Sequence, residues 1–323
     1  MAVQVVTFGE LLIDFVATER GVSVGQAPGF TKAPGGAPAN VAVGLAKLGL
    51  ASAFIGQVGA DFFGAYLTDI LREAGVDVSA LRQTAAAMTP LAFVSVAPDG
   101  EREFVFYRKP SADMLMQPTD LDTDMLRRAD IFHFGSISLI DEPLRSTTLA
   151  AIEVAQAGGA RISYDPNWRP ALWPDEATAR EGMRLGARHA NIIKVSEEEL
   201  FFMAETTDTQ TAIASLWTSQ VDCLVITRGA QGSIAYTAPD APPVVHSGFR
   251  VDVADTIGAG DGFVAGLLSG ILQNPRNWRT DMMTVILRRA NAVGALTASR
   301  AGAIPALPTQ AEVEQFLAQH DAH

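Results

Sequence analysis

The chain has 323 residues, which is long enough for one large α/β domain with an appended part or for two ordinary domains. Its 24 Lys and Arg residues against 36 Asp and Glu residues give a formal charge of −12, which excludes a global basic field for nucleic acid or anionic lipid. Any phosphate ligand must therefore be held by local groups.

The first predicted element is a buried strand over residues 3–8, which ends at Gly9. No basic and apolar leader opens the chain, and no apolar stretch approaches the length of a membrane span, so we expect a cytoplasmic protein without a membrane partner. Asp14 follows within an apolar run, where a carboxylate is costly unless it is hydrogen-bonded. A ligand hydroxyl is one such partner; the alternative is an Asp on the wet face of a strand or capping a turn.

A loop rich in Gly and Pro leads into the first predicted helix, at residues 41–48, which Gly49 ends. Gly35 and Gly36 would let the backbone approach a ligand closely. Asn40 offers both donors and an acceptor, which a polyol requires. A plain loop is the alternative interpretation.

Strands and helices alternate along the next part of the chain. A strand at residues 53–59 and a helix at residues 62–74 predict βαβ units and a parallel sheet. Two strand-like runs at residues 91–96 and 103–108 interrupt this alternation, and the Pro-Asp-Gly sequence at residues 98–100 predicts a hairpin turn between them. A hairpin inserted in an α/β pattern is a candidate lid, with a decorative edge hairpin as the alternative.

Polar residues follow a later strand, predicted at residues 161–164, in the segment 165–170. In open α/β sheets the carboxyl ends of the strands form the edge at which ligands bind. Arg169 in this segment can offer a planar fork to a phosphate, or it is a surface arginine between two proline-containing turns. His133, in the preceding strand, is expected to be a core residue.

Ser196 and Glu199 form a predicted capping box at the start of a helix that follows the strand at residues 191–195. Cys223 is the single cysteine, so a disulfide within the chain is excluded and a buried structural thiol is expected. The five histidines show no metal-ligand spacing, which argues against a zinc site.

The most informative stretch is residues 255–261, Asp-Thr-Ile-Gly-Ala-Gly-Asp, which feeds directly into an apolar helical pattern over residues 262–272. The turn would put the unpaired amides of residues 258–260 at the positive end of a helix dipole, where they form a seat for an anion. Asp261 would lie in or just before the first helical turn, and a carboxylate base beside an anion seat suits phosphoryl transfer onto a hydroxyl. The alternative is a glycine-rich loop in which Asp255 or Asp261 caps the helix.

This last stretch resembles the C-terminal signature of the ribokinase-like (PfkB) sugar kinases, and residues 33–40 resemble their N-terminal signature. Residues 106–115 are similar to the corresponding segment of the fructokinases in this family. The resemblance covers residues 9–305 and implies a three-layer α/β sandwich with a mostly parallel central sheet and a small β-sheet lid. The implied division is a main domain at residues 1–13, 32–90 and 112–323, with the lid at residues 14–31 and 91–111.

The resemblance implies an ATP-dependent kinase that phosphorylates a small sugar, with D-fructose as the first choice. The alternatives are 2-keto-3-deoxygluconate, ribose or a nucleoside as substrate and, from another class, a non-catalytic sugar-binding regulator. By the same resemblance, Asp261 deprotonates the sugar hydroxyl, and Gly258, Ala259 and Gly260 form the anion hole. The implied substrate contacts are Asp14, Gly35, Gly36, Asn40, Arg108 and Arg169; Arg108 is otherwise a solvated strand charge.

On the nucleotide side the resemblance implies ATP with Mg²⁺, on which Glu199 acts through water. Ser196 stands where the family usually carries Asn, and Asn291 matches a position near the adenine or is a satisfied amide on the helix surface. Some relatives also bind a monovalent cation such as K⁺ near Asp255. A lid sheet with one open apolar face favours a homodimer. The residues expected to line the nucleotide phosphates are Thr227, Gly229 and Gly232.

Overall fold

The computed structural model describes residues 3–96, 102–274, 278 and 280–320 of the chain. The hairpin turn predicted at residues 98–100 lies outside these described residues. Within the part of the chain that the structure describes, no helix combines the length and the hydropathy needed to cross a membrane.

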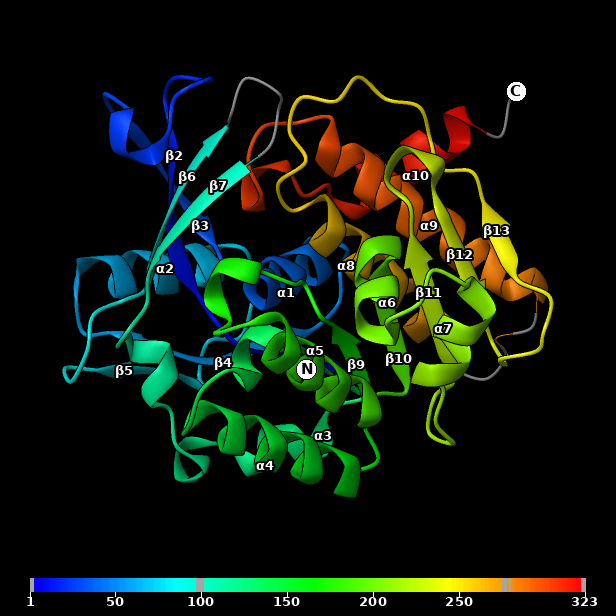
Figure 1. The fold of residues 1–323 in the computed structure, drawn as a ribbon, viewed down its shortest axis with the longest axis horizontal. Coiled ribbons are helices and arrows are strands. Elements are labelled where there is room, and N and C mark those ends of the chain that lie inside the picture. Colours follow the sequence, from blue (N-terminus) through cyan, green and yellow to red (C-terminus); the bar gives the residue numbers. More distant parts are fainter. Residues whose placement is uncertain (1–2, 97–101, 275–277, 279, 321–323) are drawn as a thin grey trace.

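Nine strands of the described chain form the central sheet, in the order β13-β12-β11-β10-β9-β8-β1-β4-β5 (Figure 1). The neighbours from β11 to β5 pair in parallel, and β12 and β13 add an antiparallel edge. The inner strands are buried along almost their whole length, as expected of parallel strands covered on both faces. The strands are β1 (Val5–Phe8), β4 (Ser52–Gly59), β5 (Leu81–Thr84), β8 (Ile131–Gly135), β9 (Arg161–Asp165), β10 (Ile192–Ser196), β11 (Cys223–Thr227), β12 (Ser233–Tyr236) and β13 (Val244–His246).

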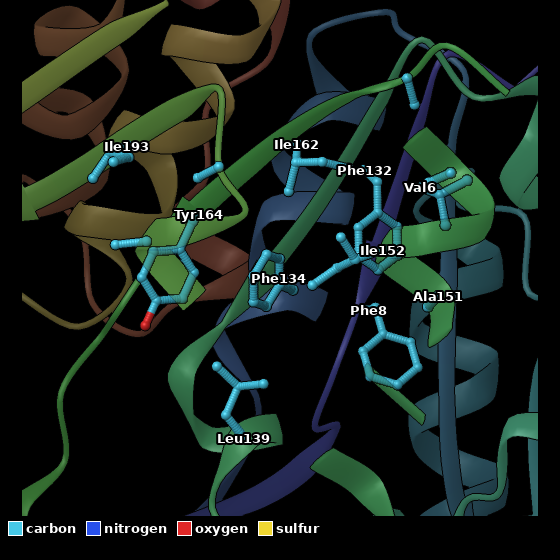
Figure 2. Packing of buried hydrophobic residues seen from close by; sticks show 14 of the residues in the cluster. Val6, Phe8, Phe132, Phe134, Leu139, Ala151, Ile152, Ile162, Tyr164 and Ile193 are labelled. Atoms are coloured by element: carbon cyan, nitrogen blue, oxygen red, sulfur yellow. The ribbon is translucent and has the colours of Figure 1, made fainter. Parts of the chain in front are cut away.

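Helices cover both faces of this sheet and make a three-layer sandwich. Successive strand residues point to opposite faces, so Val5 belongs to the hydrophobic cluster under α1, α8 and α9, whereas Val6 belongs to the cluster under α3 to α7. Figure 2 shows the second cluster, in which Phe132 and Phe134 of β8 pack with Ile152 of α4. The helices are α1 (Ala37–Lys47), α2 (Phe62–Glu73), α3 (Thr123–Arg128), α4 (Leu144–Ala157), α5 (Glu176–Arg188), α6 (Glu197–Ala204), α7 (Thr209–Leu216), α8 (Ala259–Gln273), α9 (Thr280–Ala298) and α10 (Gln310–Gln319).

A second sheet of four described strands lies beside the first, in the order β3-β2-β6-β7 (Figure 1). The two inner strands, β2 and β6, pair in parallel, and the outer pairs are antiparallel. The two strand-like runs near residues 91–108 are confirmed as β6 and β7, which pair with each other. The mostly parallel α/β fold with a small additional sheet is therefore confirmed. The strands are β2 (Leu12–Ala17), β3 (Phe30–Gly35), β6 (Leu91–Val96) and β7 (Arg102–Tyr107).

The sequence predicts the helix α1 with a start four residues too late, at residue 41. In the structure it begins at Ala37, because Pro38 fits the first turn, where a missing N–H costs nothing. The expected end is confirmed, since Gly49 adopts a positive φ of 80° just after Lys47. Cys223 and His133 are both buried, as expected.

Candidate active site

A cavity of about 170 Å³ opens at the carboxyl ends of the central strands, roughly ten times the space that one water molecule needs. The small sheet forms one wall, and the N-terminal ends of α1 and α8 form another. Seven residues singled out from the sequence line it together: Asp14, Gly36, Asn40, Arg169, Gly258, Gly260 and Asp261.

The helix α8 begins beside this cavity, as predicted. Gly258 is its N-cap, with φ 74°, and no side chain caps it, so the alternative in which an aspartate is the N-cap is wrong. The sequence predicts an unpaired Ala259 amide, but this amide donates to the Thr256 carbonyl at 3.3 Å, so that part of the prediction is wrong. Among the described residues, the amides of Gly258 and Gly260 have no such backbone partner, and both glycines line the cavity. This end of α8 can therefore hold an anion.

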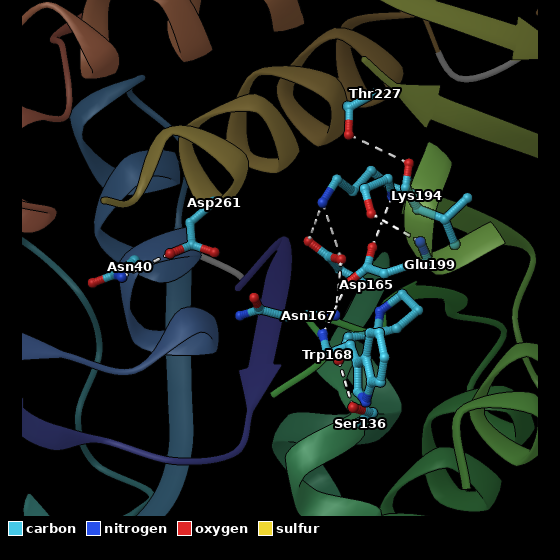
Figure 3. A network of polar contacts seen from close by, with 12 residues as sticks. Asn40, Ser136, Asp165, Asn167, Trp168, Lys194, Glu199, Thr227 and Asp261 are labelled. Carbon is cyan, nitrogen blue, oxygen red and sulfur yellow. Dashed lines mark hydrogen bonds and ion pairs between the residues drawn. The ribbon is translucent and has the colours of Figure 1, made fainter. Parts of the chain in front are cut away.

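Asp261 lies in the first turn of α8 and is buried, with 9% of its surface exposed. Burial raises the pKa of this carboxyl group. Three groups oppose that effect and favour the ionised form. The side-chain amide of Asn40 donates to Oδ2 at 2.7 Å (Figure 3), and the other two are the cations of Arg169 and Lys194. The result is a carboxyl group whose pKa lies above that of an exposed aspartate, with three neighbours that favour its charged form.

Lys194 and Asp165 form a buried ion pair at the base of the cavity (Figure 3). The Lys194 ammonium donates to the two oxygens of Asp165 at 2.9 and 3.1 Å. Burial raises the pKa of Asp165 to about 6. Burial alone would lower the pKa of Lys194, but the carboxylates of Asp165 and Glu199 outweigh it and raise that pKa. At neutral pH the pair is therefore ionised.

Glu10 is a further acid in the cavity wall, two residues after the end of β1. Its Oε1 accepts a hydrogen bond from the Ala37 amide at 3.1 Å, and burial raises its pKa to about 7. Gly36 lies opposite, with φ 110°, and a Cβ there would stand 2.3 Å from the Glu10 carbonyl oxygen. The glycine is therefore required for the close approach of the loop before α1 to the end of β1.

The small sheet contributes Asp14 on β2 and the aromatic rings of Phe104 and Phe106 on β7. Gly35 does not line the cavity itself. A Cβ at Gly35 would lie 2.1 Å from the Asp14 carboxylate, so Gly35 provides the space in which that carboxylate lies.

The segment after β9 also enters the cavity, through Asn167 and Arg169. Asn167 has a positive φ of 46°, and its backbone N–H donates to the Asp165 carboxylate at 3.2 Å. The Arg169 guanidinium donates to the Trp168 carbonyl at 3.0 Å and lies 5.8 Å from the centre of the Phe104 ring on the small sheet. Arg169 thus connects the strand end to the small sheet across the cavity.

Arg108 lies outside the cavity lining. It is 4% exposed and pairs with Asp113, with Nε 2.7 Å and Nη2 2.6 Å from the same carboxylate oxygen. The alternative of a solvated strand charge is therefore wrong. A contact of Arg108 with a sugar stays a prediction.

The predicted nucleotide residues also lie outside this cavity lining. The capping box is confirmed, since Ser196 is the N-cap of α6 and exchanges hydrogen bonds with Glu199. The other oxygen of Glu199 accepts from the Trp168 amide at 2.8 Å, which ties the segment after β9 to α6. Asn291 is a buried amide that donates to Ser233 at 2.7 Å and to the Leu287 carbonyl at 2.8 Å.

The segment after β11 contains the three residues expected at the nucleotide phosphates. Thr227 ends β11 and donates to the Val195 carbonyl at 3.3 Å. Gly229 and Gly232 both have positive φ, and they begin and follow a short 3-10 turn. Asp255 accepts from the amides of Ile257 and Gly302 at 3.0 and 3.1 Å, which ties the turn before α8 to the segment after α9. Among the described residues, no three His, Cys, Asp or Glu side chains lie together as a metal-binding group.

Sequence reasoning did not place Glu10 or Lys194 in the site, and it included Asn167 only as part of the polar segment 165–170 at the ligand-binding edge of the sheet. The clearest available signal for Lys194 was its position between the isoleucines and the valine of β10. A lysine in a buried strand needs a partner, which would have indicated a polar site beside that strand. Glu10 and Asn167 stand in loops that follow strands, where the sequence carries no periodic pattern.

The chain is similar to known proteins along almost its whole length. Residues 3–310 match the family described as pfkB family carbohydrate kinase. Fructokinase-1 of Oryza sativa subsp. japonica is 49% identical over 315 residues, which are 97% of this chain and 97% of that protein. A crystal structure of fructokinase with bound ATP from Xylella fastidiosa has a TM-score of 0.90 at 36% identity, covering 99% of this chain and 100% of that one. Fructokinase from Vibrio cholerae O395, in its fructose, ADP and calcium ion bound form, has a TM-score of 0.87 at 34% identity, covering 98% and 100%.

Proposed function

Because this chain belongs to the pfkB family of carbohydrate kinases, we propose that it transfers the γ-phosphoryl group of ATP to a hydroxyl of D-fructose. The relatives and solved structures named above are fructokinases, and the structures carry ATP, or fructose with ADP. The observation that carries the proposal is the position of Asp261, a buried carboxylate in the first turn of α8 beside two cations and two bare glycine amides.

Asp261 acts as the general base in this proposal. It accepts the proton of the sugar hydroxyl as the hydroxyl oxygen forms a bond to the γ-phosphorus. The bond from that phosphorus to the bridging oxygen breaks, and its electron pair leaves with ADP. The raised pKa of Asp261 supports this role, because a more basic carboxylate is a better proton acceptor.

The anion hole stabilises the charge on the group in transfer. We assign this role to the amides of Gly258 and Gly260, joined by Ala259 if its weak bond to Thr256 opens. The guanidinium of Arg169 adds a full positive charge at the same cavity. These groups are fixed by α8 and by the segment after β9, so little reorganisation is needed during the reaction.

We propose that Asp14, Gly36 and Asn40 surround the sugar, with Gly35 leaving room for the Asp14 carboxylate and the small sheet as a lid. The Oδ1 atom of Asn40 supports a sugar site here, because this atom is buried and has no hydrogen-bond partner among the described residues. A buried acceptor without a partner is costly, and a sugar hydroxyl would satisfy it. Arg108 is proposed to reach the sugar as the lid closes.

The nucleotide would lie along Ser196, Thr227, Gly229 and Gly232, with its base near Asn291. Mg²⁺ on its phosphates would neutralise part of their negative charge. Glu199 fits an action on that ion through water, since backbone amides occupy two of the roughly four acceptor positions of its carboxylate.

We also propose a monovalent cation, such as K⁺, at the backbone carbonyls around Asp255 and Ile257. The two hydrogen bonds accepted by Asp255 support it by fixing that turn. Equal turnover in potassium chloride and in tetramethylammonium chloride would contradict this site.

A cytoplasmic location is likewise proposed, and microscopy of the tagged protein checks it.

A coupled assay of ADP release tests the function. We expect saturable turnover with D-fructose that exceeds turnover with 2-keto-3-deoxygluconate, ribose and nucleosides. Faster turnover with one of those compounds would replace fructose as the substrate. Binding of fructose without turnover would favour a non-catalytic sugar-binding regulator instead.

A further inference from the structure

Lys194 is a charged residue in the middle of the central sheet. It lies on β10 between Ile193 and Val195 and is 7% exposed. A buried ammonium is costly unless it is paired, and its pairing with Asp165 meets that cost. A pair that served only stability could be replaced by apolar side chains at little loss, so its presence at a cavity raises the question of a second role.

The ammonium lies at the start of α8. A Cβ placed on Gly260 would stand 3.7 Å from Lys194 Nζ, and both residues line the cavity. Figure 3 shows the side chain reaching from β10 toward the side of the site where Asp261 lies. An ammonium has three N–H donors, and the two oxygens of Asp165 receive two of them. One donor is therefore available to a ligand in the cavity.

The two cations of the site come from different walls. Arg169 lies beside Phe104 of the small sheet, whereas Lys194 rises from the central sheet. An anion bound by the glycine amides of α8 would thus lie near two positive charges, that of Lys194 on the central sheet and that of Arg169 on the loop beside the small sheet.

We propose that Lys194 binds an oxygen of the phosphoryl group during its transfer, and that Asp165 holds the ammonium in position for this contact. The inference rests on the proposed kinase function. As the sugar oxygen bonds to the γ-phosphorus and the bridging bond breaks toward ADP, the hydroxyl proton goes to Asp261. Lys194 keeps its proton and stabilises the charge on the oxygens of the transferred group.

The test compares Lys194→Met with the double variant Lys194→Met/Asp165→Asn. Met removes the charge at similar length, and the double variant leaves no unpaired carboxylate, so it keeps the test valid if the single variant fails to fold. We expect kcat to fall about 100-fold in both, the usual loss for one electrostatic donor, with KM for fructose within about twofold. Wild-type kcat in the double variant would show that Lys194 is only the counter-ion of Asp165 and would overturn the proposal.

Binding provides a second readout that does not depend on turnover. Aluminium fluoride with MgADP and fructose imitates the phosphoryl group in transfer, and calorimetry measures the affinity of that complex. We expect the double variant to bind it about 100-fold more weakly than wild type, and ADP alone within about twofold. Equal affinity for the fluoride complex would also overturn the role of Lys194. A wild-type chain that turns over no sugar would count against the kinase function itself, which separates the two failures.

Discussion

The reactivity of Asp261 depends on a balance between burial, which favours the neutral acid, and Asn40, Arg169 and Lys194, which favour the carboxylate. Because burial dominates, the acidic limb of kcat against pH should lie above the ordinary pKa of 3.8 for aspartate.

The substitution Asn40→Ala removes a hydrogen bond to the charged form of Asp261 and so raises the pKa of the base further. We expect the acidic limb of kcat to move to higher pH in this variant, measured under saturating fructose and ATP. A limb that stays in place or moves to lower pH would show that another group controls it.

Glu10 links the site to stability. Its pKa is about 7 in the folded chain against 4.5 in a free side chain, so the folded state binds more protons than the unfolded state between these values. Stability contributed by protonated Glu10 is present below pH 4.5 and is lost as pH rises toward 7, by about 3 kcal/mol at most. Urea unfolding at about pH 5 and 8 should show a smaller decrease for Glu10→Gln than for wild type, and equal decreases would contradict the buried acid. Asp165 changes stability in the same direction and is present in both proteins.

At the scale of elements, the contact between α1 and α8 sets the geometry of the site. A Cβ at Gly44 of α1 would lie 2.7 Å from the Cβ of Ala265 on α8, so the two helices approach closely. This approach allows Asn40 of the first helix to bond Asp261 of the second at 2.7 Å. The base is therefore positioned by helix packing.

Two glycines at opposite ends of α1 provide a matched test of how that helix is placed. Gly36 and Gly49 have φ of 110° and 80°, but a Cβ meets the Glu10 carbonyl oxygen at 2.3 Å in the first case and nothing within 4 Å in the second. We expect Gly49→Ala to cost about 1 kcal/mol of unfolding free energy and Gly36→Ala about 3 kcal/mol or more, with weaker fructose binding. Urea titration and calorimetry measure both, and equal losses would contradict a special role for the loop before α1.

The elements with strong local patterns could be predicted from sequence, and α8 with Asp261 in its first turn is the clearest case. The pairing of Lys194 with Asp165 could not be predicted, because the two residues are 29 positions apart in the chain and meet only through the pairing of β9 with β10. The engagement of the Ala259 amide by Thr256 also escaped prediction, since it depends on the exact backbone of the turn. Sequence pattern thus identifies the motif, and only the sheet order shows which charges meet there.

At the scale of the whole molecule, we propose that the small sheet pairs with a second copy of the chain to form a homodimer. Phe93 on β6 packs against Phe15, Phe30 and Tyr107, with ring centres 5.1 to 5.4 Å apart, and Tyr107 remains 65% exposed. Val94, the residue after Phe93 on β6, points to the opposite face of the sheet and lines the cavity. One face of the small sheet therefore borders the cavity, and the other carries this aromatic cluster.

We expect light scattering to show a dimer for wild type and a shift toward monomer for Tyr107→Asp, because a charge in an apolar interface lacks a partner. Val285→Asp, at a residue that is 58% exposed on α9, is the control and should leave the dimer intact. A wild-type monomer, or an unaffected Tyr107 variant, would contradict pairing through this sheet.

The most direct test of the whole account is turnover by Asp261→Asn with fructose and ATP, measured beside wild type in one coupled assay. Asn keeps the shape of the side chain and removes the proton acceptor, so we expect kcat to fall by about 1000-fold while fructose affinity changes less than about twofold. A variant that retains a tenth of the wild-type rate would remove Asp261 from the role of base and with it the proposed mechanism.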